Sequence, residues 1–441
     1  MSNSVVWRSR GVLGAVILCA VCMVYYHLVY FVPRAQEIRT AQGFGTGYSF
    51  GADFYPIWFT AREGLLQHRD PYSPEMTRKI QIGLFGRPLD AQHPAAPIDY
   101  RTFAYPAFTD ILLWPLAILP FSVVRIVLAL ILAAVTALSI VLWLKALQLL
   151  AGPAMLTALI LLTLSSYAVL EGLFAEQMGL LVGFLLAASL TALVRERLFL
   201  SGSLLALALI KPQMILLVAL YLLCWACVRW RTRWPFVAGF FSVSALLLVS
   251  SLLVWPRWIQ EWLRVMFGYR QYSTPPLASL LLGHQIGSRL GPILIAALLA
   301  SALAVAWRMR HSSAASMEFA LTLSFLLAIT VITLLPGHAV YDHVLLLPGV
   351  ILIVLSWRNF AATRPFRVIL AITALAVFWP WISAPIVIAI RPMLSHDLFV
   401  SKMLTLPIRT AASIPFGVCA LLGLMMWREA DKKTRNGNEA N

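Results

Sequence analysis

Residues 121–146 read FSVVRIVLALILAAVTALSIVLWLKA, an almost unbroken apolar run. A helix needs about 20 apolar residues to cross the hydrocarbon core of a bilayer. Similar runs recur along the chain, from residue 11 near one end to residue 427 near the other. Their repetition predicts an all-α polytopic membrane protein, a bundle of about 11–12 transmembrane helices.

The composition indicates a single membrane domain over residues 1–441. The chain is 61% apolar, only 12% of its residues are charged, and its mean hydropathy is +0.83. A soluble protein of this size needs far more charged surface. A membrane β-barrel is not favoured, because its strands would alternate apolar and polar residues.

The formal net charge of +16 does not indicate a nucleic-acid partner. The basic residues stand in short clusters between apolar runs, for example Arg229, Arg231 and Arg233. This distribution follows the positive-inside rule of membrane proteins. The sequence contains no compact basic domain that could bind a nucleic-acid duplex. We therefore expect a multi-pass membrane protein, with membrane lipids as its surroundings.

The five cysteines lie inside apolar runs at positions 19, 22, 224, 227 and 419. Neither Cys-x-x-C pair has a histidine or a second pair at zinc spacing, so packing is favoured over metal binding or redox chemistry. Residues 11–32 are long for the apolar core of a signal peptide, so we expect a retained first helix.

The apolar runs and the basic clusters together predict a topology with both termini in the cytoplasm. A large external catalytic loop covers residues 33–105, and residues 107–119 dip into the membrane and return. A second external loop covers residues 256–290, and residues 428–441 form a cytoplasmic tail. The unbroken predicted spans are 11–32, 121–146, 153–170, 178–194, 235–255, 291–307, 315–335, 344–357, 367–390 and 410–427.

Residues 198–228 are predicted to form two helices that meet at Lys211-Pro212-Gln213. Proline fits the first turn of a helix, and the residue before a proline resists helical geometry. The first of these helices is too short to cross the membrane, and helices of this kind often end in a cavity lined by protein. The break therefore predicts a functional position for Lys211.

Ionisable and amide side chains gather at the predicted external face. They come from four parts of the sequence: Asp53; Glu176 and Gln177; Lys211; and His338, Asp342 and His343. Such groups are costly near the hydrocarbon, so they tend to face a bundle interior or a wet cavity. Their convergence predicts an active site next to the aromatic-rich first loop.

Six short motifs follow one another along the chain. They are Asp53-Phe54-Tyr55, Asp70-Pro71-Tyr72, Phe103-Ala104-Tyr105-Pro106, Glu176-Gln177-Met178, Lys211-Pro212-Gln213 and Tyr341-Asp342-His343. Their order resembles glycosyltransferase family 87, which contains polyprenol-phosphate-mannose-dependent α-1,2-mannosyltransferases with the membrane GT-C fold. The resemblance covers most of residues 45–360. The family's usual Tyr-Pro-Pro and Gly-Gln appear here as Tyr105-Pro106-Ala107 and Glu176-Gln177.

The resemblance implies a GT-C-like helical bundle and a hexosyltransferase that acts without a metal or other cofactor. The implied donor is a polyprenyl-phosphate-linked sugar, mannose in the family, and the acceptor is a glycolipid or polysaccharide. Asp53 would be the general base that deprotonates the acceptor hydroxyl. An in-line attack would invert the anomeric centre of the sugar.

The other candidate residues fall into two groups under this resemblance. Lys211, His338 and Arg270 would bind the donor phosphate, because charge-assisted hydrogen bonds strengthen as the charge of the anion grows. The substrate-binding group comprises Tyr55, Trp58, Tyr105, Glu176, Gln177, Asp342 and His343.

Several of these residues also fit a structural role. Asp53 could cap a helix in the loop, His338 could bond the backbone at a turn, and Arg270 could belong to a solvated loop. Asp342 and His343 are adjacent, so on a helix they point about 100° apart, and one would pack while the other lines the cavity.

Aromatic side chains near the span ends have two interpretations. Anchoring at the membrane interface is the default, while Trp58 is the best candidate for stacking on a sugar. The stretch from Trp255 to Phe267 places tryptophans at helical spacing and predicts an amphipathic helix on the membrane surface.

The leading hypothesis is a membrane glycosyltransferase whose active site faces the periplasm or exterior. The alternative is a transporter or flippase of a lipid-linked sugar, because broken helices also occur in transporters. No repeat of two halves is apparent, and the polar residues cluster at one face rather than at the midplane. Both features favour the enzyme, and a non-catalytic assembly subunit is a third hypothesis.

Overall fold

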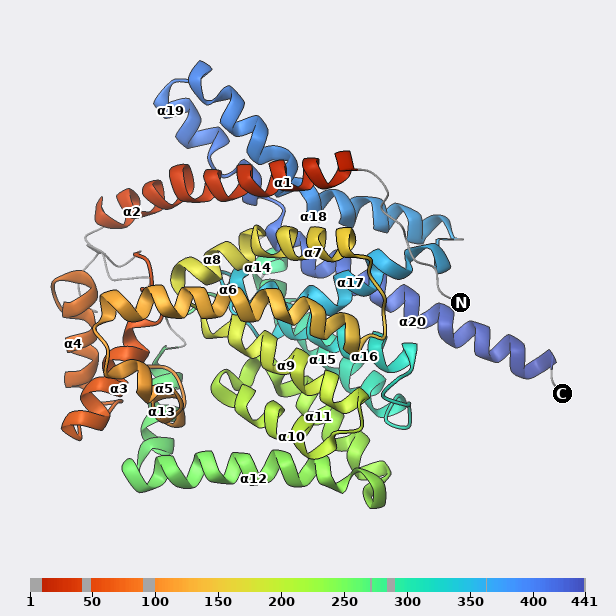
Figure 1. Ribbon diagram of the computed structural model, residues 1–441, viewed down its shortest axis with the longest axis horizontal. Coiled ribbons are helices and arrows are strands. Elements are labelled where there is room, and N and C mark those ends of the chain that lie inside the picture. Colours follow the sequence, from red (N-terminus) through yellow and green to blue (C-terminus); the bar gives the residue numbers. More distant parts are fainter. Residues whose placement is uncertain are drawn as a thin grey trace.

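The computed structural model describes residues 10–41, 49–89, 100–269, 272–283, 290–361 and 363–439. These residues form helices and turns and no strand, so the predicted all-α class is confirmed. Figure 1 shows long helices that run across the molecule, with a group of short helices at one end.

The first part of the chain forms eight α-helices and a π-helical turn. They are α1 (Arg10–Tyr25), η1 (Tyr26–Phe31), α2 (Val32–Ala41), α3 (Tyr55–Gln67), α4 (Pro74–Phe85), α5 (Phe108–Ala117), α6 (Phe121–Ala146), α7 (Pro153–Leu164) and α8 (Tyr167–Ala175).

The middle part continues with α9 (Met178–Val194), α10 (Leu198–Leu207), η2 (Ala208–Ile210), α11 (Pro212–Val228), α12 (Trp230–Val254), α13 (Trp258–Tyr269), α14 (Leu277–Gly283), α15 (Leu290–Arg308) and α16 (Met317–Thr333). The last part contains η4 (Val340–Leu346), α17 (Leu347–Ser356), η5 (Trp357–Asn359), α18 (Arg364–Ile390), η6 (Arg391–Met393), α19 (His396–Leu398), η7 (Phe399–Met403), η8 (Leu406–Ile408), η9 (Ala411–Ser413) and α20 (Ile414–Glu439).

Seven helical stretches of the described residues are long and apolar enough to span a membrane. They are Gly11–Ala41, Phe121–Ala146, Trp230–Val254, Leu290–Arg308, Val340–Asn359, Arg364–Met393 and His396–Asp431. The α7–α8 pair, bent by 56°, would be one further, broken span, and five shorter apolar helices accompany these elements. The chain is a multi-pass membrane protein, and the number of 11–12 spans stays a prediction.

Several boundaries differ from those predicted by apolarity. The first helical stretch continues past residue 32 to Ala41, because the polar residues of α2 keep helical geometry after the apolar run ends. The predicted loop of residues 33–105 contains α3 and α4, and the predicted tail continues α20 to Glu439. The break before Pro212 lies where the sequence predicts it, because η2 ends at Ile210 and α11 begins at Pro212.

Serine caps explain where three helices begin. The hydroxyl oxygens of Ser73, Ser166 and Ser316 accept hydrogen bonds from backbone N–H groups at the starts of α4, α8 and α16, over 3.1, 3.3 and 3.2 Å. Such caps satisfy donors that have no partner within the helix. Ser166 therefore lets the chain restart as α8 directly after α7 ends, which produces the bend.

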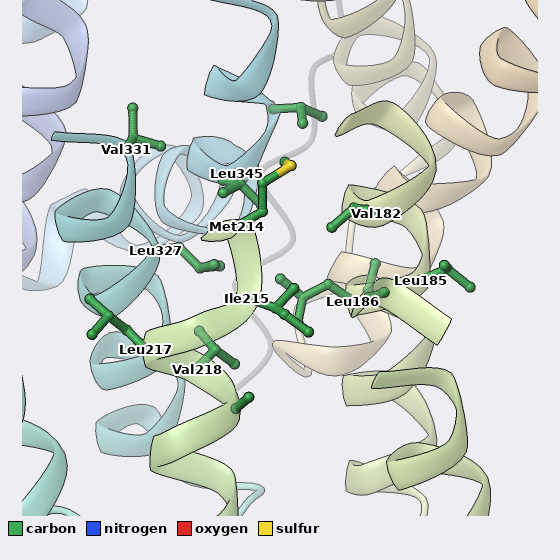
Figure 2. Close-up of a cluster of buried hydrophobic side chains, with 14 of the residues drawn as sticks. Val182, Leu185, Leu186, Met214, Ile215, Leu217, Val218, Leu327, Val331 and Leu345 are labelled. Atoms are coloured by element: carbon green, nitrogen blue, oxygen red, sulfur yellow. The ribbon is translucent and has the colours of Figure 1, made fainter. Parts of the chain in front are cut away.

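The buried core lies between α9, α11, α16 and η4. Figure 2 shows Val182 and Leu186 of α9 on one side of α11 and Leu327 of α16 on the other, with Met214 and Val218 of α11 between them. Close packing of such side chains gives a membrane bundle much of its stability, because lipid is as apolar as the core. This core holds the first residues of α9 and α11 in fixed positions.

Two glycines let α10 and α12 approach backbone to backbone. A Cβ at Gly202 would lie 2.7 Å from the backbone nitrogen of Phe240, and a Cβ at Gly239 would overlap the carbonyl of Phe199. Small residues at such crossings permit the short distance between helices. Because α10 and η2 lead directly to Lys211, this crossing also positions that residue.

We predict that Gly239→Ala destabilises the protein, because its methyl group would collide with rigid backbone of α10. Overpacking of this kind costs about 1–3 kcal/mol. Thermal unfolding of the purified protein in detergent should show a lower Tm. Gly14→Ala is the matched control, since a Cβ at Gly14 meets nothing within 4 Å. Equal Tm values for the two variants would contradict the prediction.

Candidate active site

The turn that carries Asp53 is fastened to the end of α8. Gly51 has φ +80°, in the left-handed region that favours glycine. Its N–H donates to the carbonyl of Phe174 over 2.8 Å, and the N–H of Asp53 donates to the carbonyl of Ala175 over 3.1 Å. Two backbone hydrogen bonds thus fix Asp53 against a segment more than a hundred residues later in the chain.

The junction between α8 and α9 supplies the next contact. α8 ends at Ala175, and the next residue, Glu176, has left-handed geometry (φ 59°). The N–H of Gln177 donates to the carbonyl of Gly172 over 2.8 Å. The side-chain amide of Gln177 donates to Oδ2 of Asp53. Gln177 therefore contacts the predicted base itself, as well as closing the helix end.

Arg101 is the main site residue that sequence reasoning missed. Its guanidinium donates to Oδ1 of Asp53, and both side chains are only 15% exposed. A charge-assisted bond of this kind is roughly twice as strong as a neutral one. The sequence feature that indicates a site role for Arg101 is its position, two residues before the Phe103-Ala104-Tyr105-Pro106 motif.

Lys211 lies at the break before α11 and is 7% exposed. Its Nζ donates to Oδ1 and Oδ2 of Asp342 over 2.8 and 3.2 Å, and to Oε1 of Gln177 over 3.3 Å. The Lys211 Nζ also lies 5.2 Å from the ring centre of Tyr341. The lysine thus connects η4 with the α8–α9 junction.

These contacts form one chain of hydrogen bonds, which we call the site chain: Arg101, Asp53, Gln177, Lys211 and Asp342. Its members come from five separate segments, and positive and negative side chains alternate around the neutral amide. Such compensation is what permits charges to be buried.

Gly179 in the first turn of α9 makes room for the buried pair. A Cβ there would overlap Oδ1 of Asp342 and would lie 3.5 Å from Nζ of Lys211. A side chain at position 179 would therefore occupy the place of the carboxylate. The lack of a side chain at Gly179 therefore leaves room for the Lys211–Asp342 pair.

The surroundings of Asp53 keep its carboxylate ionised. Burial acts to raise the pKa of Asp53, but the charge and hydrogen bond of Arg101, the hydrogen bond of Gln177 and the charge of Lys211 together lower it below its usual value. At neutral pH, Asp53 is therefore in the form that a general base requires.

Tyr105 lies within the electrostatic reach of both carboxylates of the site chain. Burial, followed by the charges of Asp53 and Asp342, raises the pKa of Tyr105 well above its usual value, so its hydroxyl remains a hydrogen-bond donor. The carbonyl of Tyr105 accepts from the hydroxyl of Tyr72 over 2.7 Å, which connects the Asp70-Pro71-Tyr72 motif with the site. The substrate-binding role of Tyr105 stays a prediction.

Tyr55 and Trp58 do not join this group. The Tyr55 ring packs against Phe121 with centroids 5.0 Å apart, and a Cβ at Gly83 of α4 would overlap its hydroxyl. Trp58 also contacts Phe121, and its indole N–H donates to the carbonyl of Leu119 over 3.0 Å. Both residues thus hold α3 against the start of α6, and their predicted substrate contacts stay a prediction.

The remaining candidates are His338, His343 and Arg270. His338 is exposed, its Nδ1 lies 2.6 Å from Oγ1 of Thr274, and its backbone N–H donates to the same oxygen over 3.2 Å. His343 follows Asp342 in a 3₁₀-helix, where neighbours project about 120° apart, so the two side chains leave the helix in different directions. Arg270 lies outside the described residues.

Glu176 is fully buried, and its carboxyl group lies under the turn of Gly51 rather than in the site chain. The predicted contact of Glu176 with substrate stays a prediction. Among the described residues, no group of three or more His, Cys, Asp and Glu side chains could hold a metal ion.

The site chain offers an ionised carboxylate for proton abstraction and two cations for an anionic substrate, at one end of a membrane bundle. Comparison with protein families matches residues 103–336 to glycosyltransferase family 87, more than half of the 441 residues. Comparisons with curated proteins and with solved structures give no match. The family match includes the α8–α9 junction and Lys211, and the chain belongs to glycosyltransferase family 87, a family of membrane glycosyltransferases.

Proposed function

We propose that the protein transfers a sugar from a polyprenyl-phosphate donor to a glycolipid or polysaccharide acceptor. The order of its motifs favours mannose as the sugar and the external face of a bacterial inner membrane as the place. The observation that carries the proposal is the site chain, in which an ionised carboxylate lies within one hydrogen-bond network with two cations.

Asp53 has the properties of the general base. It accepts hydrogen bonds through both carboxylate oxygens, from Arg101 and Gln177, and these bonds leave further lone pairs for an acceptor hydroxyl. The lowered pKa of Asp53 is compatible with base catalysis. In an oxocarbenium-like transition state, cleavage of the bond between sugar and phosphate is more advanced than attack by the acceptor, so the acceptor hydroxyl becomes acidic late in the reaction.

Lys211 and Arg101 have the properties of phosphate partners. The donor is a phosphodiester with a single negative charge, and the released polyprenyl phosphate is a monoester with up to about two. Cations beside the departing oxygen gain attraction as that charge develops, so they stabilise the transition state more than the bound donor. Tyr105 adds a neutral hydroxyl donor, which burial and the charges of Asp53 and Asp342 keep protonated.

The reaction balances without a further reactant. The acceptor oxygen forms a bond to the anomeric carbon while the bond from that carbon to the phosphate oxygen breaks. The electron pair leaves on the phosphate, and the proton of the acceptor hydroxyl passes to Asp53. The configuration of the anomeric carbon inverts, because attack and departure are on opposite sides.

The transporter hypothesis makes a different prediction for the same donor. An enzyme releases polyprenyl phosphate only when an acceptor takes the sugar, whereas a flippase moves the intact lipid across the bilayer. Family membership favours the enzyme. Reconstitution in vesicles with a radiolabelled polyprenyl-phosphate sugar distinguishes the two by whether labelled polyprenyl phosphate and sugar separate.

We predict that Asp53→Asn lowers sugar transfer by about 10²–10⁴-fold, because the amide keeps the shape but cannot take a proton. The assay follows labelled sugar from polyprenyl phosphate into glycolipid with purified protein in vesicles. Asp397→Asn is the matched control, since Asp397 is exposed and far along the chain. Wild-type transfer by the Asp53 variant, with its thermal unfolding unchanged, would remove Asp53 as the base.

We predict that Lys211→Met destabilises the protein by about 3–5 kcal/mol, because it leaves the carboxylate of Asp342 buried without its cation. The double variant Lys211→Met/Asp342→Asn should recover most of this stability, since neither charge remains. It should still lack transfer, because the phosphate partner is gone.

Thermal unfolding and the transfer assay separate these two effects of Lys211. The matched control is Lys145→Met, which removes an exposed lysine at the end of α6. Wild-type transfer by the double variant would show that Lys211 serves folding alone.

A further inference from the structure

Glu176 combines burial with a conformation that is unusual for its residue type. It is 0% exposed, and its φ of 59° places it in the left-handed region. Such backbone geometry costs a non-glycine residue of order 1–3 kcal/mol and is concentrated at functional sites. The strain indicates that the surrounding contacts hold this residue in place.

The carboxyl group of Glu176 lies directly against the turn that carries Asp53. A Cβ at Gly51 would be 2.8 Å from its Oε2 and 3.1 Å from the ring of Phe121. On either side of this contact, Gly51 donates to Phe174 and Asp53 donates to Ala175. The position of the Asp53 turn therefore depends on what fills the space under Gly51.

Neither carboxyl oxygen of Glu176 has a hydrogen-bond partner among the described residues. The charge of Arg125 of α6 attracts the group, but Arg125 donates no hydrogen bond to either carboxyl oxygen. The Arg125 guanidinium instead lies over the ring of Phe50, 5.9 Å from its centre. The side chains of Arg101 and Gln177 bond to Asp53 rather than to Glu176. A carboxylate without a partner is expensive to bury, so this group keeps its proton.

The protonation of Glu176 follows from these surroundings. Burial raises the pKa of Glu176 to about 8, and the charge of Arg125 opposes part of this rise. At neutral pH the turn therefore rests on an uncharged acid. Ionisation would place a negative charge under Gly51 with no donor to receive it, and its demand for water or for Arg125 would disturb the turn.

Building on the proposed transfer reaction, we propose that Glu176 is a positioning residue for Asp53. It supports the turn of Gly51 as a neutral acid, and its ionisation switches transfer off at alkaline pH. The residue touches neither substrate nor reacting atoms and acts through the backbone of the Asp53 turn.

The first test compares pH profiles of transfer. For the wild-type protein, the rate should fall by about tenfold between pH 7 and pH 9, as one group ionises near pH 8. Glu176→Gln cannot ionise, so its profile, scaled to its own maximum, should lack this fall. Glu176→Ala should lower kcat more than Glu176→Gln does, with KM little changed, because it removes the support and not only the proton.

The matched control for this test is Glu75→Gln, which removes an acid whose side chain is 71% exposed and should keep the alkaline fall of the wild type. An alkaline fall that persists in Glu176→Gln would assign it to another group and overturn the proposal. Equal kcat values for Glu176→Ala and Glu176→Gln would overturn the supporting role.

The second test does not need activity. With a pKa raised in the folded state, the stability that Glu176 contributes is complete below about pH 4.5 and is lost as pH rises to about 8. The Tm of Glu176→Gln minus that of the wild type should therefore grow between pH 5 and pH 8 and then stay constant. A Tm difference that does not change with pH would overturn the buried neutral acid.

The two tests separate failure of this inference from failure of the proposed function. If the wild-type protein transfers no sugar from any polyprenyl-phosphate donor but the Tm difference grows with pH, the proposed reaction is wrong and the buried acid stands. If transfer is observed, the pH profile of Glu176→Gln matches that of the wild type and the Tm difference between them does not change with pH, the inference is wrong and the reaction stands.

Discussion

Gln177 is the side chain on which the arrangement of the site depends. Its amide nitrogen donates to Asp53 while its amide oxygen accepts from Lys211. A neutral group that both donates and accepts can join an acid to a base without adding charge. The Arg101–Asp53 and Lys211–Asp342 pairs thereby form one network instead of two isolated ion pairs.

The membrane bundle delivers these groups through interruptions of its helices. Asp53 precedes α3, Gln177 stands between α8 and α9, Lys211 stands between η2 and α11, and Asp342 lies in η4. Within apolar surroundings a regular helix satisfies its own backbone and presents few polar atoms, whereas its ends do not. Charged and amide side chains at helix ends can therefore converge, while apolar side chains of α9, α11 and α16 pack together inside the bundle (Figure 2).

Local signals in the sequence were sufficient for the class of fold and for part of the site. Apolar runs predicted the membrane helices, and Pro212 predicted the break that places Lys211. Arg101 was missed because its partner Asp53 is 48 positions away, and no spacing rule predicts such a contact. Tyr55 is a candidate because it belongs to the Asp53-Phe54-Tyr55 motif, and Trp58 because it lies five residues from Asp53, but sequence position does not show that both side chains pack on Phe121. The left-handed φ of Glu176 also explains why glycine suits the position before Gln177.

The charges of the site chain predict that donor binding precedes proton abstraction in the proposed reaction. Arg101 and Lys211 balance Asp53 and Asp342, so a donor phosphate must compete with carboxylates for the two cations. An Arg101 that turned from Asp53 to the phosphate would remove the charge that does most to lower the pKa of Asp53. The base would then become stronger only when the donor is bound. Because Gln177 stays as a partner of Asp53, the carboxylate would keep its position while its proton affinity rises, and proton abstraction would be coupled to occupation of the donor site.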